Sequence, residues 1–142
     1  MREFILTGAE LLKFRDKDHF VALCMECPNY GKNYACPPVP DTVTEKIFSE
    51  KTVHVIIETC RSLSERDSLK KRLDIELRQR DHVVFSTGHC TKCYPCKRIQ
   101  NLPCCDFLYS ADISGINFFA LYEHLTGEKL KFDGLTLIYL TA

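Results

Sequence analysis

The sequence predicts an α/β protein, a small sheet with helices packed on it and cysteine-rich loops extending from one end. Residues 52–59 are dense in β-branched side chains, residues 62–80 form an amphipathic segment, and residues 81–86 are again apolar. A strand, a helix and a strand in this order predict a right-handed βαβ unit with parallel strands. Nine cysteines in 142 residues, five of them between positions 90 and 105, predict the cysteine-rich loops.

Length, composition and charge narrow the class of protein. The chain has 142 residues, 45% apolar and 27% charged, which predicts a single soluble domain over residues 1–142. The formal net charge is zero, so nothing favours a nucleic-acid partner. No stretch reaches the roughly 20 apolar residues of a membrane span. Glu3 and Glu10 interrupt any export signal, so we expect a cytoplasmic protein. In a reducing compartment, clustered cysteines bind metal more often than they form disulfides.

The first third of the chain predicts short elements and one long loop. Residues 3–14 favour a short helix with Thr7 as a possible N-cap. Residues 19–23 read as a short apolar strand or an extended lead-in, and the proline-rich residues 24–40 as an ordered loop. Asp41 or Thr42 then begins a helix that ends near Glu50.

The rest of the chain predicts the sheet and its two main helices. After the strand at residues 52–59, Ser62 or Ser64 begins a helix that reaches Arg80. Its expected apolar stripe is Leu63, Leu69, Leu73 and Leu77, and its expected solvated face includes Lys70, Lys71 and Arg72. A further helix runs from Asp112 or Ser114 to Leu125 and stops at Gly127, and residues 135–140 form a last strand. The expected inner face of that helix is Ile116, Phe119, Ala120 and Leu125.

Residues 88–105, GHCTKCYPCKRIQNLPCC, form the strongest motif of the chain. Cys90, Cys93 and Cys96 stand at two strict Cys-x-x-Cys intervals, and Cys104 and Cys105 follow. A Cys-x-x-Cys turn points two thiolates at one ion or cluster. Three such thiolates with a fourth further along are typical of iron–sulfur clusters, and a tetrahedral zinc site uses the same turn.

A second group of cysteines lies upstream, in residues 24–40. Cys24 and Cys27 form another Cys-x-x-Cys pair, and Cys36 follows; Cys27 and Cys36 each precede a proline. In ferredoxin-like runs a Cys-Pro step supplies a remote cluster ligand. The fourth ligand of the Cys90 group is therefore either local, from Cys104 or Cys105, or remote, from Cys36. The candidate metal ligands are Cys24, Cys27, Cys36, Cys90, Cys93, Cys96, Cys104 and Cys105.

These motifs resemble a family known only as predicted metal-binding proteins. The stretch CMECPNYGKNYACPPVP, residues 24–40, is similar to that family's first signature, and residues 90–104 match its later cysteine run. SADISGIN, residues 110–117, stands where the family has Ser-Met-Glu-Ala-x-Gly-Ile-Asp. The resemblance implies iron–sulfur or another metal, and no substrate. The chain departs from the family at Ala111, Asp112, Asn117 and Cys105, which leaves open any reaction that those positions serve.

Other side chains are weaker candidates. Cys60 reads as a buried thiol, and His54 and His124 as packing residues, whereas His89 could ligate a metal or lie in solvent. Tyr30, Tyr34 and Tyr94 could shield a cluster from water or simply pack the loops. Four basic residues could offset cluster charge or attract an acidic redox partner: Lys32, Lys92, Lys97 and Arg98.

The sequence therefore predicts an iron–sulfur protein with one or two clusters, most simply 4Fe–4S, acting in electron transfer or redox sensing with a partner protein. One alternative is a structural zinc protein, whose sites pin loops that bury little apolar surface. The other is an enzyme whose cluster has an open iron. No catalytic residue can be assigned, and the sequence does not predict an oligomeric state.

Overall fold

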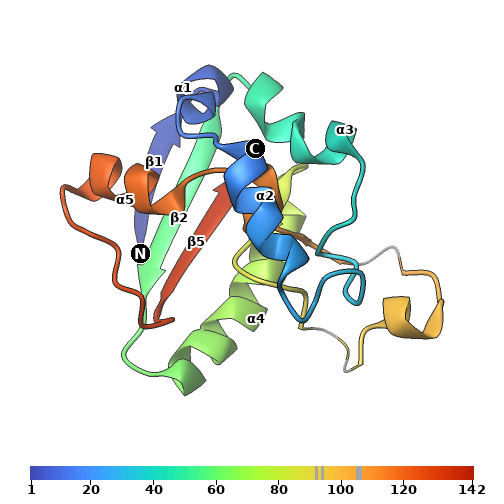
Figure 1. Ribbon diagram of the computed structural model, residues 1–142. Helices are drawn as coiled ribbons and strands as arrows, with labels where there is room; N and C mark the ends of the chain where they lie inside the picture. Colours follow the sequence, from blue (N-terminus) through green and yellow to red (C-terminus); the bar gives the residue numbers. More distant parts are fainter. Residues whose placement is uncertain (92, 94, 105–106) are drawn as a thin grey trace.

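The computed structural model describes residues 1–91, 93, 95–104 and 107–142. Within these residues, five strands form one mixed sheet in the order β1-β2-β5-β3-β4 (Figure 1). The strands are β1 (Arg2–Leu6), β2 (Val53–Thr59), β3 (Val84–Ser86), β4 (Tyr109–Ser110) and β5 (Thr136–Thr141). The predicted α/β class is confirmed.

The predicted βαβ unit is present, but its two strands are not neighbours. The long helix α4 (Leu63–Arg80) joins β2 to β3, and both strands run antiparallel to β5, which lies between them. Leu140 of β5 pairs with Val55 on one side and Phe85 on the other. Every residue of β5 after Thr136 is buried, as expected of a strand in the centre of a sheet.

Helices cover both faces of the sheet. On one face, Leu73 and Leu77 of α4 pack with Leu137 and Tyr139 of β5. On the other face, the alternate side chains of the same strands contact α1 (Gly8–Leu12), α5 (Phe118–Thr126) and the 3-10 turns η1 (Lys46–Ser49) and η3 (Ala111–Ser114). Two further short elements, α3 (Asp41–Thr44) and η2 (Lys97–Gln100), lie near the cysteine loops. Among the helices of the described chain, none is long and apolar enough to span a bilayer.

The N-terminal prediction is partly wrong. Residues 2–6 form the edge strand β1, and only then does Thr7 cap α1, through a capping box with Glu10. Residues 19–23 are not a strand, because they belong to helix α2 (Lys17–Met25). Its partly shielded positions are Lys17, Phe20, Val21 and Cys24, and their spacings of three, one and three residues are helical.

The predicted C-terminal helix is divided in two. Gly115, at φ +75°, ends η3, and Asn117 then caps α5. A Cβ atom at Gly115 would lie 2.6 Å from the Cα of Lys17, so the break brings η3 against the start of α2. The buried side of α5 is Leu121 and Tyr122. The predicted inner face is therefore wrong for Phe119 and Ala120, which are exposed, and correct for Ile116 and Leu125, which pack in the core. Gly127 ends the helix as expected.

Helix α4 buries a charged residue that the sequence placed in solvent. Lys70 is 6% exposed, and its Nζ donates to Asp74 Oδ2 and to Ser86 Oγ, both at 2.8 Å. Ser86 Oγ and Tyr139 OH donate to the other oxygen of Asp74, at 2.7 and 2.8 Å. The solvated-face prediction is therefore wrong for Lys70 and correct for Lys71 and Arg72. Leu63, predicted to be apolar-facing, is 56% exposed.

Candidate metal centre

The two cysteine loops lie side by side and are joined by direct hydrogen bonds (Figure 1). The guanidinium of Arg98, in η2, donates from Nη1 to the carbonyl oxygens of Asn33 and Cys36, at 3.1 and 2.8 Å. Its Nη2 donates to the carbonyl oxygen of Pro38 at 3.3 Å. Arg98 therefore acts as a clamp between the loops, a role that the sequence did not predict.

Asn33 makes a second connection between the loops. Its side chain is buried, its Nδ2 donates to the carbonyl oxygen of Cys90 at 2.9 Å, and its Oδ1 accepts from the amide of Ala35 at 3.0 Å. Asn29 Nδ2 and His89 Nδ1 lie 3.3 Å apart. Because burial first, and then the charges of Lys70 and Arg66, lower the pKa of His89, its ring is held neutral. With its proton on Nε2, a neutral His89 can accept a hydrogen bond from Asn29 Nδ2 at its Nδ1.

Aromatic rings cover the junction. Tyr34 of the first loop stacks on Phe107, which follows the second loop, with ring centroids 5.3 Å apart. The Tyr34 hydroxyl donates to the carbonyl oxygen of Leu102, and the Arg98 guanidinium lies 5.9 Å from the Tyr34 centroid. Tyr34 therefore packs the two loops together, as one of the two sequence interpretations proposed, and the structure does not test the other, shielding of a cluster; Tyr30 is exposed.

Four cysteines of the second group line one cavity. Its volume is about 80 Å³, and its walls are the side chains of Cys90, Cys93, Cys96 and Cys104 with Tyr34, Lys97 and Phe107. Cys93 is exposed, and the other three thiols are half-buried. The cavity therefore gathers, from the described residues, the three Cys-x-x-Cys thiols and the nearer of their two local partners.

The three cysteines of the first group are close enough to interact electrostatically. Cys24 lies in the last turn of α2, Cys27 follows it in an exposed turn, and Cys36 is buried. Burial first, and then the charges of Asp112 and Cys27, raise the pKa of the Cys24 thiol to about 11. Burial, Cys27, Cys24 and Asp112 raise the pKa of Cys36 to about 12, and Arg98 opposes this rise. Both thiols are protonated at neutral pH until a cation displaces their protons.

Asp112 acts electrostatically on Cys24 and Cys36, whereas the sequence analysis treated it only as a possible helix start and as a departure from the family. It lies in η3, which packs against α2 and so against Cys24. Just before it, the amide of Ser110 donates to the carbonyl oxygen of Ala35 at 2.8 Å, which fixes its distance from Cys36. Part of Asp112 is exposed, but burial of its carboxyl group raises the pKa of that group. A hydrogen bond with Ser110 has the smaller, opposite effect and lowers the pKa. The signal in the sequence was that Asp112 stands where the family has glutamate, so a carboxyl group is kept at this position.

The comparison with protein families agrees with this geometry. A family model described as "Predicted metal-binding protein (DUF2284)" matches residues 12–136, a span that contains both cysteine groups, η3 and the scaffold between them. The chain belongs to this family. Membership supports metal binding and leaves the metal unspecified. No curated protein and no solved structure is significantly similar to the chain.

Family membership does not by itself assign ligands. Among the described His, Cys, Asp and Glu side chains, no three have the arrangement of ligands around one metal ion. Cys105, with Lys92 and Tyr94, lies outside the described residues. The described cysteines of the two motifs lie in two groups. Cys36 lies beside Cys24 and Cys27, and Cys104 lies beside the Cys90 group.

The remaining candidates lie apart from both groups. Cys60 is buried after β2, and the charges that act on it are those of Glu65, Glu58 and Arg66. His54 Nδ1 contacts Glu3 Oε1 at 2.6 Å, across β1 and β2. His124 packs on Phe14, with ring centroids 5.2 Å apart. Each of the three has a structural role that needs no metal.

Proposed function

We propose that the chain is an iron–sulfur protein and that its four-cysteine cavity holds a 4Fe–4S cluster. The observation that supports this most is the cavity of about 80 Å³ that Cys90, Cys93, Cys96 and Cys104 line together with Tyr34, Lys97 and Phe107. Four thiolates closed on zinc, with bonds of about 2.3 Å, would bring their sulfurs to about 3.8 Å from one another and leave no such space. Four cysteines around a larger group are the usual ligand set of a 4Fe–4S cluster.

The same cavity favours the local choice of fourth ligand. Cys104 lines it together with the three Cys-x-x-Cys thiols, whereas Cys36 interacts with Cys24, Cys27 and Asp112. We assign Cys90, Cys93, Cys96 and Cys104 to one site, and Cys105 remains a proposed ligand without a described position. The first group then has three thiolates, and Asp112 is the nearest candidate for a fourth donor.

The first group is therefore the proposed place for chemistry, if the protein is an enzyme. A carboxylate binds iron less tightly than a thiolate, because iron in a sulfur environment prefers soft ligands. Three thiolates and Asp112 would leave one iron or one metal ion able to exchange its ligand. Asp112→Asn keeps the shape of the side chain and removes its charge, so it should lower the metal content of the first group and leave the second intact. Unchanged metal content in both groups would remove Asp112 from the ligand set.

Electron transfer is the function that the position of the groups supports. Cys93 and Cys27 are exposed, so each group reaches the surface, as electron transfer to another protein requires. Large apolar side chains beside the cysteines in the chain are exposed: Leu23, Met25, Ile99 and Leu102. Exposed apolar residues next to a redox centre are suited to a transient partner, and the exposed Lys32 and Lys97 favour one with an acidic rim.

Redox titration tests this function against a structural zinc site. Protein purified without oxygen is reduced stepwise and reoxidised while its visible absorbance is followed. We expect a broad visible band that bleaches and returns over repeated cycles, and its loss in the Cys104→Ser variant. A colourless protein that contains stoichiometric zinc and does not respond to the reductant would establish the zinc alternative.

A further inference from the structure

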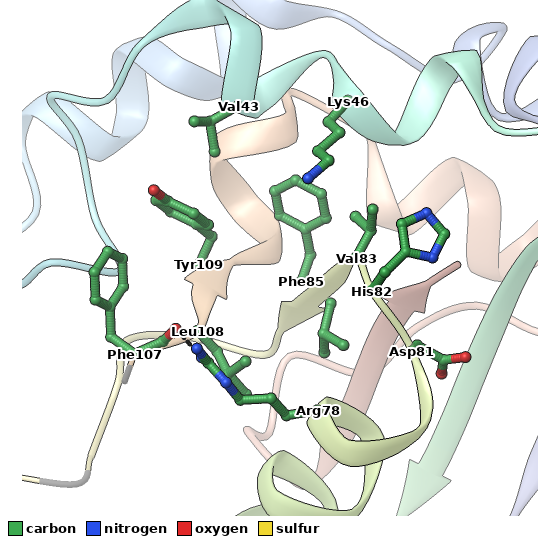
Figure 2. Close-up of a pocket in the computed structure, with 11 residues that line it drawn as sticks. Val43, Lys46, Arg78, Asp81, His82, Val83, Phe85, Phe107, Leu108 and Tyr109 are labelled. Carbon is green, nitrogen blue, oxygen red and sulfur yellow. Dashed lines mark hydrogen bonds between the residues drawn. The ribbon is translucent and has the colours of Figure 1, made fainter. Parts of the chain in front are cut away.

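A second and larger cavity lies next to the cysteine groups. Its volume is about 490 Å³, within the range of about 300–1,000 Å³ of small-molecule sites. It opens where the first residues of β3 and β4 meet the end of α4, and α3 and η1 cover its other side (Figure 2). Among the described residues, no cysteine side chain lines it, so an occupant would make its contacts with other side chains.

Aromatic rings form a continuous path from this cavity to the cysteine cavity. Phe85 and Tyr109 lie 6.4 Å apart between centroids, Tyr109 and Phe107 5.0 Å, and Phe107 and Tyr34 5.3 Å. Phe107 lines both cavities, and Tyr34 lines the one with the cysteines. The two cavities therefore share one wall, and a flat molecule on Tyr109 and Phe107 would lie one ring away from the proposed cluster.

Lys46 is the charged side chain of this cavity for which the described residues offer no ion-pair partner. Figure 2 shows Lys46 extending from η1 toward Phe85. Among the residues that the structure describes, Lys46 has no ion-pair partner, since its neighbour Glu45 contacts Arg15 and Lys17 at 3.5 and 3.9 Å.

The other charged groups of the lining are engaged elsewhere. Asp81 is paired with Arg80 at 2.9 Å, and His82 with Glu50 at 3.0 Å. Arg78 donates to the carbonyl oxygen of Phe107 and so holds the shared wall in place. The lining thus combines an apolar, aromatic floor with an ammonium group at one end.

We propose that this cavity binds a small planar organic carboxylate, with its ring on Tyr109 and Phe107 and its carboxylate on the Lys46 ammonium. An aromatic floor favours a flat apolar body, and a single available cation favours one negative charge. The site goes beyond the proposed redox function and does not depend on it. It would, however, bring such a ligand next to the metal, through Phe107.

Binding of 2-naphthoate tests the proposal, with the neutral 2-naphthamide as its control. We expect the full-length protein to bind naphthoate at least tenfold more tightly than naphthamide in a calorimetric titration. Amide chemical-shift changes should centre on Val43, Phe85 and Tyr109. Lys46→Met keeps the length of an exposed side chain without its charge, so it should abolish this preference. Lys71→Met, which removes a charge from the exposed face of α4, should leave it unchanged.

Three results would overturn the proposal. The first is that naphthoate does not bind at millimolar concentration. The second is that naphthoate and naphthamide bind with equal affinity. The third is that Lys46→Met still prefers naphthoate to naphthamide. The result does not depend on metal content, because both compounds are titrated into the same preparation, with and without metal. If the cavity does not bind carboxylates, the iron–sulfur proposal is therefore unaffected. If the protein holds no iron–sulfur cluster, the carboxylate proposal is equally unaffected.

Discussion

The guanidinium of Arg98 donates a hydrogen bond to the carbonyl oxygen of Cys36, 62 residues away in the chain, at 2.8 Å and so joins the two cysteine groups. With its bonds to Asn33 and Pro38, it holds the first loop against η2. Hydrogen bonds from a charged donor contribute about 1.5–3 kcal/mol each when shielded from water, and less when half-exposed as here.

Replacing Arg98 should therefore release both loops. In Arg98→Met we expect about 2 kcal/mol less stability of the closed loops, which is below the roughly 3 kcal/mol expected of two fully shielded bonds of this kind, because Arg98 is half-exposed. Amide exchange should become faster in residues 33–38 and 88–98, and less metal should be retained after dialysis. Lys71→Met removes a charge from the exposed face of α4 and serves as the control. Slow exchange in both loops of Arg98→Met would show that metal or apolar packing, rather than Arg98, holds them together.

Metal removal should affect the loops before the scaffold. The sheet and α4 pack through apolar side chains such as Leu73, Leu77 and Leu137, which need no metal. The cysteine loops bury few apolar side chains of their own, so ligation and folding are coupled there. After treatment with a strong chelator, we expect amide protection to fall in residues 24–38 and 88–104 and to persist in α4, β2 and β5. Simultaneous loss of protection in all of these elements would contradict the separation of scaffold and site.

The buried Lys70 network should be intolerant of a single substitution. Lys70→Met leaves Asp74 as an unpaired charge in a buried position, at an expected cost of about 3–5 kcal/mol in the free energy of unfolding. Lys71→Met, one residue away and exposed, should change that free energy by less than about 0.5 kcal/mol. Urea denaturation of the two variants measures the difference. Equal stability would mean that Asp74 does not need its lysine partner.

Substitution of single cysteines should separate the two groups. We expect Cys36→Ser to lower the metal content of the first group, and Cys96→Ser that of the second, while Cys60→Ser changes little. Metal analysis of the three variants, prepared identically, gives the partition directly. Full metal retention by Cys96→Ser would invalidate the whole ligand assignment, whereas full retention by Cys36→Ser would remove only the first group.

Local chemistry made much of the scaffold predictable. The β-branched residues of β2, the Ser62 cap of α4 and the Gly127 stop of α5 each act within a few residues, so their sequence signals were sufficient. The position of β5 between β2 and β3 was not predictable, because strand order depends on contacts between distant segments. The short apolar run at residues 19–23 was mistaken for a strand. Its helical spacing becomes visible only when Cys24, in the last turn of α2, is included among the shielded side chains.

The candidate site also has features that the sequence predicts and features that depend on tertiary packing. Motif spacing identified the cysteines, and spacing alone left the fourth ligand of the Cys90 group open between Cys36, Cys104 and Cys105. The hydrogen bonds from Arg98 and Asn33, and the approach of Asp112 to Cys24, arise from tertiary packing between η2, η3 and α2. Lys70 was placed in solvent because it begins a basic run with Lys71 and Arg72, and only the fold reveals Ser86 and Asp74 as its partners.

Iron and acid-labile sulfide content is the most direct test of the iron–sulfur assignment. The protein is produced with iron and sulfur supplied, purified without oxygen, and compared with its Cys104→Ser variant. The account predicts iron and sulfide in near-equal amounts, about four of each for every occupied four-cysteine cavity, and their loss from that cavity in the variant. Stoichiometric zinc without sulfide in the unsubstituted protein would contradict it.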